Sequence, residues 1–112
     1  MMRKNIIKLD LANKAELYAS YMPNIKNGAI FVATDKPYQL GDEVFLLLSL
    51  MGEEEKQAVA GTIVWITPRD ANNNKVPGIG IQFNDSDKGV TRKKIDTYLA
   101  TELNSEKLTY TL

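Results

Sequence analysis

The strongest constraint on the fold is a hairpin pattern in the middle of the sequence. Residues 44–51 (VFLLLSLM) form the longest apolar run, interrupted by Ser49, and residues 57–67 (QAVAGTIVWIT) form a second run rich in β-branched residues. The short charged segment 52–56 (GEEEK) between them has the composition of a hairpin tip. Because residues 44–51 are apolar on both faces, they are predicted to form a central strand of a sheet.

Five other parts of the sequence carry strand or bulge signals. Residues 3–11 and 29–33 (AIFVA) are predicted strands, and residues 78–83 (GIGIQF) alternate apolar side chains with small or polar ones. Gly61, inside the second half of the hairpin, predicts a bulge or bend. The last segment, 108–112 (LTYTL), also alternates like a strand.

Two segments have helical character. Residues 12–22 (ANKAELYASYM) are rich in helix formers, and Pro23 is expected to stop this helix because the residue before a proline is pushed towards extended backbone. A second helix is predicted over residues 88–103, with Ser86 or Asp87 as its cap. Its apolar positions follow the spacing of one helical face: Ile95, Tyr98, Leu99 and Leu103.

The order of these elements indicates a mainly β fold. The connections are of hairpin size, there is no strand–helix–strand rhythm, and a helix follows the strands, so we expect an antiparallel barrel closed at one end by that helix. A chain of 112 residues is the size of one domain. We therefore expect a single domain over residues 1–112, with the barrel and helices in residues 3–103 and a C-terminal tail in residues 104–112.

The composition excludes several kinds of site. The chain has no Cys and no His, so disulfides, thiolate chemistry, the usual transition-metal ligands and a histidine base are absent. Fourteen basic and fourteen acidic residues give a net charge of zero, which argues against nucleic-acid binding. Serines without a histidine partner do not make a catalytic nucleophile, so we expect no enzyme activity and no metal or cofactor. After the basic residues Arg3 and Lys4, only Ile6 and Ile7 precede Lys8, far fewer than the about 7–15 apolar residues of a signal peptide, which predicts a cytoplasmic protein.

Six runs of the sequence, in this order and spacing, carry a family resemblance: 18–23 (YASYMP), 28–32 (GAIFV), 40–48 (LGDEVFLLL), 60–68 (AGTIVWITP), 78–83 (GIGIQF) and 109–112 (TYTL). With them the sequence resembles the PilZ-domain family, and within it the members that act in type IV pilus assembly. The resemblance covers nearly the whole chain and implies a six-stranded antiparallel PilZ-type β-barrel with a short N-terminal helix and a C-terminal helix. It also implies a role in pilus biogenesis and twitching motility.

Many PilZ domains bind cyclic di-GMP through an Arg-x-x-x-Arg segment before the barrel and an Asp-x-Ser-x-x-Gly loop. This chain has no arginine between Lys4 and Pro68, and its loop 23–28 (PNIKNG) keeps only the glycine. Losing two bidentate arginines is expected to cost several kcal/mol of binding free energy. We therefore expect no direct binding of cyclic di-GMP, the alternative being a direct receptor for this or another nucleotide.

By the same resemblance, the chain is expected to be a non-catalytic adaptor that works through protein contacts. The implied partners are a PilB-like pilus extension ATPase and a FimX-like EAL-domain protein that binds cyclic di-GMP. Such an adaptor would be a cytoplasmic monomer that does not insert into the membrane and is recruited to the pilus machinery of the inner membrane.

Seven residues are candidates for the contact with these partners. In the helix predicted over residues 12–22, Tyr18 and Met22 share a face that would pack on the barrel, which leaves Tyr21 exposed. Trp65 lies in a strand that is apolar on both sides, so either a core position or an exposed position near the strand end is possible. The tail either folds back or presents an edge to a partner. The candidates are Tyr21, Met22, Trp65, Pro68, Leu108, Tyr110 and Leu112.

Overall fold

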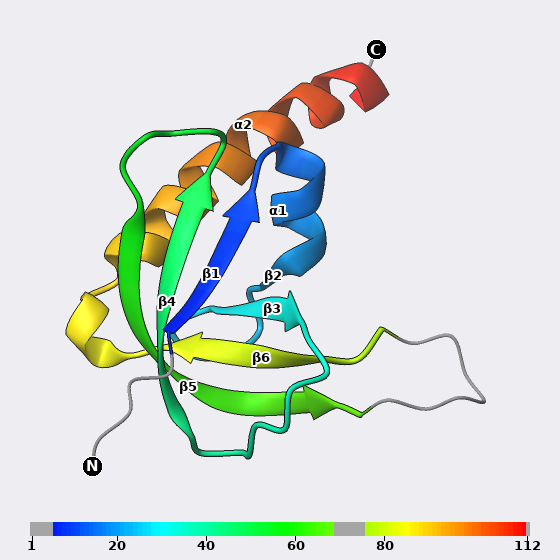
Figure 1. Ribbon diagram of the computed structural model, residues 1–112. Coiled ribbons are helices and arrows are strands. Elements are labelled where there is room, and N and C mark those ends of the chain that lie inside the picture. The colour runs from blue at the N-terminus through cyan, green and yellow to red at the C-terminus, as the bar shows by residue number, and fades with distance from the viewer. Residues whose placement is uncertain (1–5, 69–75, 112) are drawn as a thin grey trace.

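The fold is one six-stranded sheet curled into a half-barrel, with a long helix behind it (Figure 1). The computed structural model describes residues 6–68 and 76–111, with side chains up to residue 100. The strand order is β1-β4-β5-β6-β3-β2. The strands are β1 (Ile6–Leu11), β2 (Tyr21–Met22), β3 (Ala29–Ala33), β4 (Glu43–Leu50), β5 (Gln57–Thr67) and β6 (Gly78–Phe83).

The sheet confirms the predicted mainly β fold but is not purely antiparallel. The predicted hairpin is present as the antiparallel pair β4–β5, and β4 is central. In contrast, β1 and β4 run parallel, from Ile6 beside Phe45 to Leu11 beside Leu50. The chain leaves β1 through a helix and two other strands before it returns along β4, and such a crossover permits parallel pairing.

Helix α1 (Lys14–Ser20) is shorter than the helix expected over residues 12–22. It begins after Asn13, whose side-chain oxygen accepts a hydrogen bond from the backbone N–H of Glu16 at 2.9 Å. The Glu16 carboxylate in turn accepts from the backbone N–H of Ala12 at 3.2 Å. At its other end the backbone is already extended at Tyr21, two residues before Pro23, so the last predicted helical turn forms β2 instead.

Helix α2 (Val90–Thr111) begins as predicted but continues further. Asp87, in the short helix η1 (Asp85–Asp87), accepts hydrogen bonds from the backbone N–H and the hydroxyl of Thr91 at 2.8 and 2.9 Å. The segment expected to be a separate strand-like tail is helical up to Thr111. The sequence between Val90 and Thr111 contains no Gly or Pro that would end a helix, and short-range alternation did not outweigh that continuity.

The core fills the concave side of the sheet and is covered by the two helices. Leu17 from α1 and Ile95 and Leu99 from α2 are buried against it. An ion pair between Lys94 Nζ and Glu53 Oε1, 2.6 Å apart, ties α2 to the tip of the β4–β5 hairpin. The buried strand residues include Val44, Leu46, Leu48, Leu50, Val59, Ile63, Ile79, Ile81 and Phe83.

Candidate partner-binding face

A bulge in β5 turns Trp65 out of the core. Up to Ile63, the odd-numbered residues of β5 point inward, but the pairing with β6 shifts register between Ile63 and Trp65. After the shift Ile66 packs against the core and Trp65 is 52% exposed. An extra residue in one strand reverses which side chains face the core. The bulge expected at Gly61 therefore lies at Val64, while Gly61 gives room for Ile81 and the backbone of Gln82.

Two glycines of β6 form the floor of an exposed aromatic surface. Gly80 is paired with Trp65 on one side and Phe31 on the other. A Cβ atom at position 80 would lie 2.9 Å from Trp65 Cβ and 3.3 Å from Met22 Sδ. At Gly78, such an atom would lie within 2.7 Å of the Phe31 ring and 2.6 Å from the carbonyl oxygen of Val32. The missing side chains let these groups lie close to β6, and we call this surface (Met22, Phe31, Trp65, Gly78 and Gly80) the Trp65 face.

The Trp65 ring is fixed in orientation. Its Nε1–H donates to Thr67 Oγ1, 2.8 Å away, on the same strand. The one polar group of the ring is thus satisfied within the protein, and its exposed surface is apolar. A rigid, exposed aromatic side chain loses little conformational entropy when a partner covers it.

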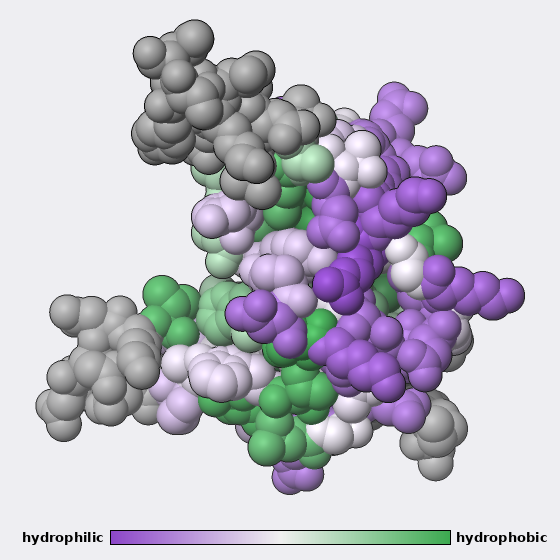
Figure 2. Space-filling model, turned by 180° about the vertical axis from the view of Figure 1, so that it is seen from behind, coloured by the Kyte–Doolittle hydropathy of each residue, from purple (hydrophilic) through white to green (hydrophobic). Residues whose placement is uncertain are grey.

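A groove lies between the end of α1 and helix α2. It has a volume of about 520 Å³, and we call it the Tyr18 groove. Seen from behind, the molecule divides into a strongly hydrophilic half and a half of apolar and weakly polar residues (Figure 2). In the sequence, Met22 of the Trp65 face is followed directly by Pro23, which lines the groove. Its lining residues are Tyr18, Tyr21, Pro23, Asp96, Leu99 and Ala100.

The exposure of the two tyrosines in the groove is the reverse of what the sequence predicts. Tyr18 is 65% exposed, whereas Tyr21 is 9% exposed and belongs to the core cluster. The helical-face argument was wrong at Tyr21 because α1 ends at Ser20. Tyr21 lies in β2 and is paired with the buried Ile30 of β3, so its side chain also points inward. Met22, the next residue of the strand, therefore points outward.

The Tyr21 hydroxyl is held beneath the groove by α2. It donates to Asp96 Oδ1 at 3.0 Å. Burial, and then the hydrogen bond and negative charge of Asp96, raise the pKa of Tyr21 above its ordinary value. The neutral phenol thus joins β2 to α2 and fixes the floor of the Tyr18 groove.

In the loop between β2 and β3, residues 23–28, the Asn27 side chain and two backbone carbonyls are hydrogen-bonded within the protein. Gln82 Nε2 donates to the Lys26 carbonyl at 2.9 Å, and Asn27 Nδ2 donates to Asp85 Oδ1 at 2.7 Å. Arg92 Nη2 approaches the Pro23 carbonyl at 3.4 Å. Arg92 is the one arginine among the described residues, since Arg3 and Arg69 lie outside them. The loop therefore presents no pair of arginines for a phosphate or guanine within the part of the chain described.

A comparison with models of protein families finds a match for this fold. The model of the PilZ domain matches residues 4–101. The chain belongs to the PilZ-domain family. PilZ domains are generally non-catalytic binding domains, which take cyclic di-GMP or act as adaptors. A comparison with curated proteins gives no significant match.

The remaining candidates of this PilZ domain are spread over different parts of the structure. Met22 and Trp65 are brought together over Gly80. Pro68 is exposed after β5 and lines a separate hollow of about 270 Å³. Leu108 and Tyr110 lie in α2, in the part without described side chains, and Leu112 lies outside the described residues.

Sequence reasoning missed Tyr18, Phe31, Gly78 and Gly80. The signal was present in the segment GIGIQF, where glycines occupy the outward positions of a half-buried strand. Such glycines often mark a close approach by another group. Across the described residues, no cluster of three metal-ligating side chains occurs, and no helix is long and apolar enough to cross a membrane.

Proposed function

We propose that this PilZ domain is a non-catalytic adaptor in type IV pilus biogenesis and twitching motility. It links a PilB-like extension ATPase to a FimX-like EAL-domain protein, and it carries the cyclic di-GMP signal through protein contacts without binding the nucleotide. It acts as a cytoplasmic monomer that is recruited to the pilus machinery at the inner membrane. The partners come from the resemblance of the sequence to pilus-type family members.

The observation that carries the adaptor proposal is the Trp65 face. Trp65 is half exposed, its N–H is satisfied by Thr67, and both Trp65 and Met22 lie over Gly80. Aromatic residues and methionine are enriched at the centre of protein interfaces, where they account for much of the binding energy. The Tyr18 groove, between α1 and α2, is a second hollow with aromatic and apolar lining.

The chemistry of the 23–28 loop favours an adaptor over a cyclic di-GMP receptor. Membership of the family is compatible with either function. Receptor function requires arginine forks that can reach phosphate and guanine. In the described parts of the chain only Arg92 is available, and it lies between the Pro23 carbonyl and the Asp96 carboxylate.

Co-purification of three proteins tests this proposal. The EAL-domain protein, immobilised with cyclic di-GMP, should retain the extension ATPase only when this PilZ domain is added. Calorimetry of the PilZ domain alone with cyclic di-GMP should give no binding heat at micromolar concentrations. Micromolar binding would support the receptor alternative, and retention of the ATPase without the PilZ domain would contradict the linking role.

A further inference from the structure

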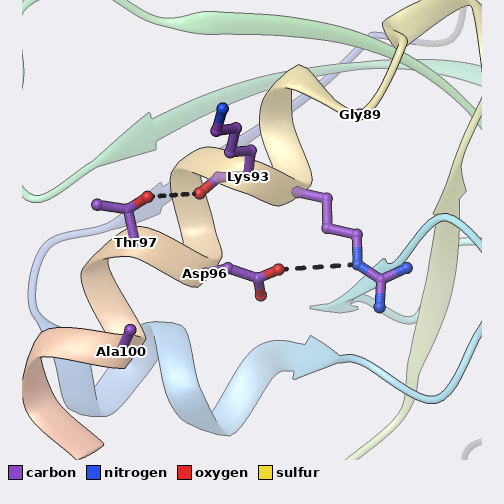
Figure 3. A pocket seen from close by; sticks show the side chains of 6 residues that line it. Gly89, Lys93, Asp96, Thr97 and Ala100 are labelled. Atoms are coloured by element: carbon purple, nitrogen blue, oxygen red, sulfur yellow. Dashed lines mark hydrogen bonds and ion pairs between the residues drawn. The ribbon is translucent and has the colours of Figure 1, made fainter. Parts of the chain in front are cut away.

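Helix α2 carries side chains of both charges beside the Tyr18 groove. These side chains line a shallow hollow along one side of the helix (Figure 3). In this view Lys93 and Asp96 point in different directions, and a dashed line marks the ion pair of Asp96. Asp96 and Ala100 line both the hollow and the groove, so the two form one surface. The lining residues are Gly89, Arg92, Lys93, Asp96, Thr97 and Ala100.

The carboxylate of Asp96, the acidic group on this surface, already has partners within the protein. Asp96 Oδ1 accepts from the Tyr21 hydroxyl, and Oδ2 faces Arg92 Nε at 3.8 Å. A cation arriving from a partner would compete with Arg92 for the same carboxylate. The surface therefore does not select a basic partner.

The basic groups, in contrast, keep capacity for a new contact. The Arg92 guanidinium contacts Asp96 at 3.8 Å and the Pro23 carbonyl at 3.4 Å, and both contacts are long. It also interacts with the Tyr21 hydroxyl, which partly offsets the rise in the pKa of that phenol. Lys93 is exposed. Lys94 differs, because it is paired with Glu53 at 2.6 Å. An arginine has five donors in a planar fork that matches a carboxylate, so Arg92 can donate to a second carboxylate.

The apolar part of the same surface lies next to Arg92. Tyr18, Pro23 and Leu99 line the groove, and Pro23 also provides the carbonyl that Arg92 approaches. We propose that this surface binds a partner segment that places an apolar side chain in the Tyr18 groove and a nearby carboxylate on Arg92. This inference rests on the proposed adaptor function and adds the chemistry of the partner: an extended or helical protein segment that is both acidic and apolar.

Selection of displayed random peptides tests this without knowledge of the partner. The wild-type chain, immobilised, should enrich peptides in which Asp or Glu stands within one helical turn of an aromatic or aliphatic residue. With Arg92→Gln as bait, the acidic preference should disappear, and the best wild-type peptide should bind about tenfold more weakly. Lys88→Gln removes an exposed cation outside both hollows and should bind like the wild type.

Arg92→Lys separates charge from geometry. It should show an intermediate affinity because an ammonium replaces the planar fork. Thermal melting of each variant checks that the fold is retained. Enrichment of basic peptides, absence of enrichment, or an unchanged selection with Arg92→Gln would overturn this inference. A chain that selects acidic and apolar peptides but does not retain the extension ATPase would contradict the proposed function alone.

Discussion

Trp65 and Gly80 face each other across the β5–β6 pair, so that a side chain at position 80 would meet Trp65 Cβ at 2.9 Å. The bulge at Val64 brings the indole to the outer side of the sheet, and the glycine gives it space. Because the Trp65 side chain is held in this position, the Trp65 face is formed before any partner binds.

Gly80→Ala should displace the indole and lower stability. The added methyl group overlaps with Trp65 Cβ and approaches Met22 Sδ at 3.3 Å. Overpacking of this kind costs about 1–3 kcal/mol of unfolding free energy. The chain has one tryptophan, so its intrinsic fluorescence should shift in the folded state and report the displacement directly. Ala58→Ser, an exposed change elsewhere on β5, should leave both fluorescence and stability unchanged.

Tyr21→Phe should remove the contact between β2 and α2. Losing the hydrogen bond to Asp96 is expected to lower the free energy of unfolding by about 0.5–1.5 kcal/mol at neutral pH, measured by urea denaturation. Tyr18→Phe, on the exposed side of α1, should have no such effect. Equal stability of Tyr21→Phe and the wild type would argue against the contact.

The Tyr21 hydroxyl should also make the free energy of unfolding depend on pH in alkaline solution. Burial first, and then Asp96, raise the pKa of Tyr21, so the folded state holds this proton more tightly than the unfolded state. The stabilisation is fully present below the unfolded pKa of 10.0 and is lost as pH rises through the higher folded value. Denaturation curves above pH 10.0 should therefore fall more steeply for the wild type than for Tyr21→Phe. Parallel curves would contradict the shift.

Much of the fold could be predicted from the sequence, because its signals are local. The apolar run over residues 44–51 and the charged tip at 52–56 correctly place the central hairpin, and Asp87 has the predicted capping role. The expected exposure of Tyr21 is wrong because it assumes that the helix continues to residue 22. Whether one residue belongs to a helix or to a strand changes the face on which its side chain lies.

The site was harder to predict because it depends on register. The direction of Trp65 follows from a bulge between strands, which periodicity within one strand cannot reveal. Likewise, Met22 of β2 and Trp65 of β5 both lie over Gly80 of β6, a placement that no single segment reveals. The parallel pairing of β1 with β4 also depends on the path of the whole chain.

Asp87→Ala should weaken the start of α2. The carboxylate accepts from both the backbone N–H and the hydroxyl of the fully buried Thr91. Its loss should cost about 1–2 kcal/mol, since a capping bond and a buried hydroxyl partner are lost together. Ser86→Ala, the other residue that the sequence offered as a cap, should be neutral in the same thermal melts. The reverse order would place the cap at Ser86.

The ion pair between Lys94 and Glu53 should add to the docking of α2 on the β4–β5 hairpin. Both side chains are about 70% buried (28% and 31% exposed), and their charged atoms are 2.6 Å apart. A double-mutant cycle with Lys94→Gln and Glu53→Gln should give a coupling of about 0.5–1 kcal/mol that decreases with salt. A coupling of zero at low salt would show that the pair does not hold the helix.

The affinity of the extension ATPase for Trp65→Ala, measured by calorimetry against wild type and Phe45→Ala, tests the adaptor account most directly. Phe45 is the matched control, because it is an aromatic residue of similar exposure (44%) on β4. Removing a central aromatic anchor should cost about 2 kcal/mol or more, which is a loss of about 30-fold, while Phe45→Ala should bind like the wild type. Equal binding by Trp65→Ala and the wild type, with the fold intact, would contradict the central claim that the Trp65 face is the docking surface.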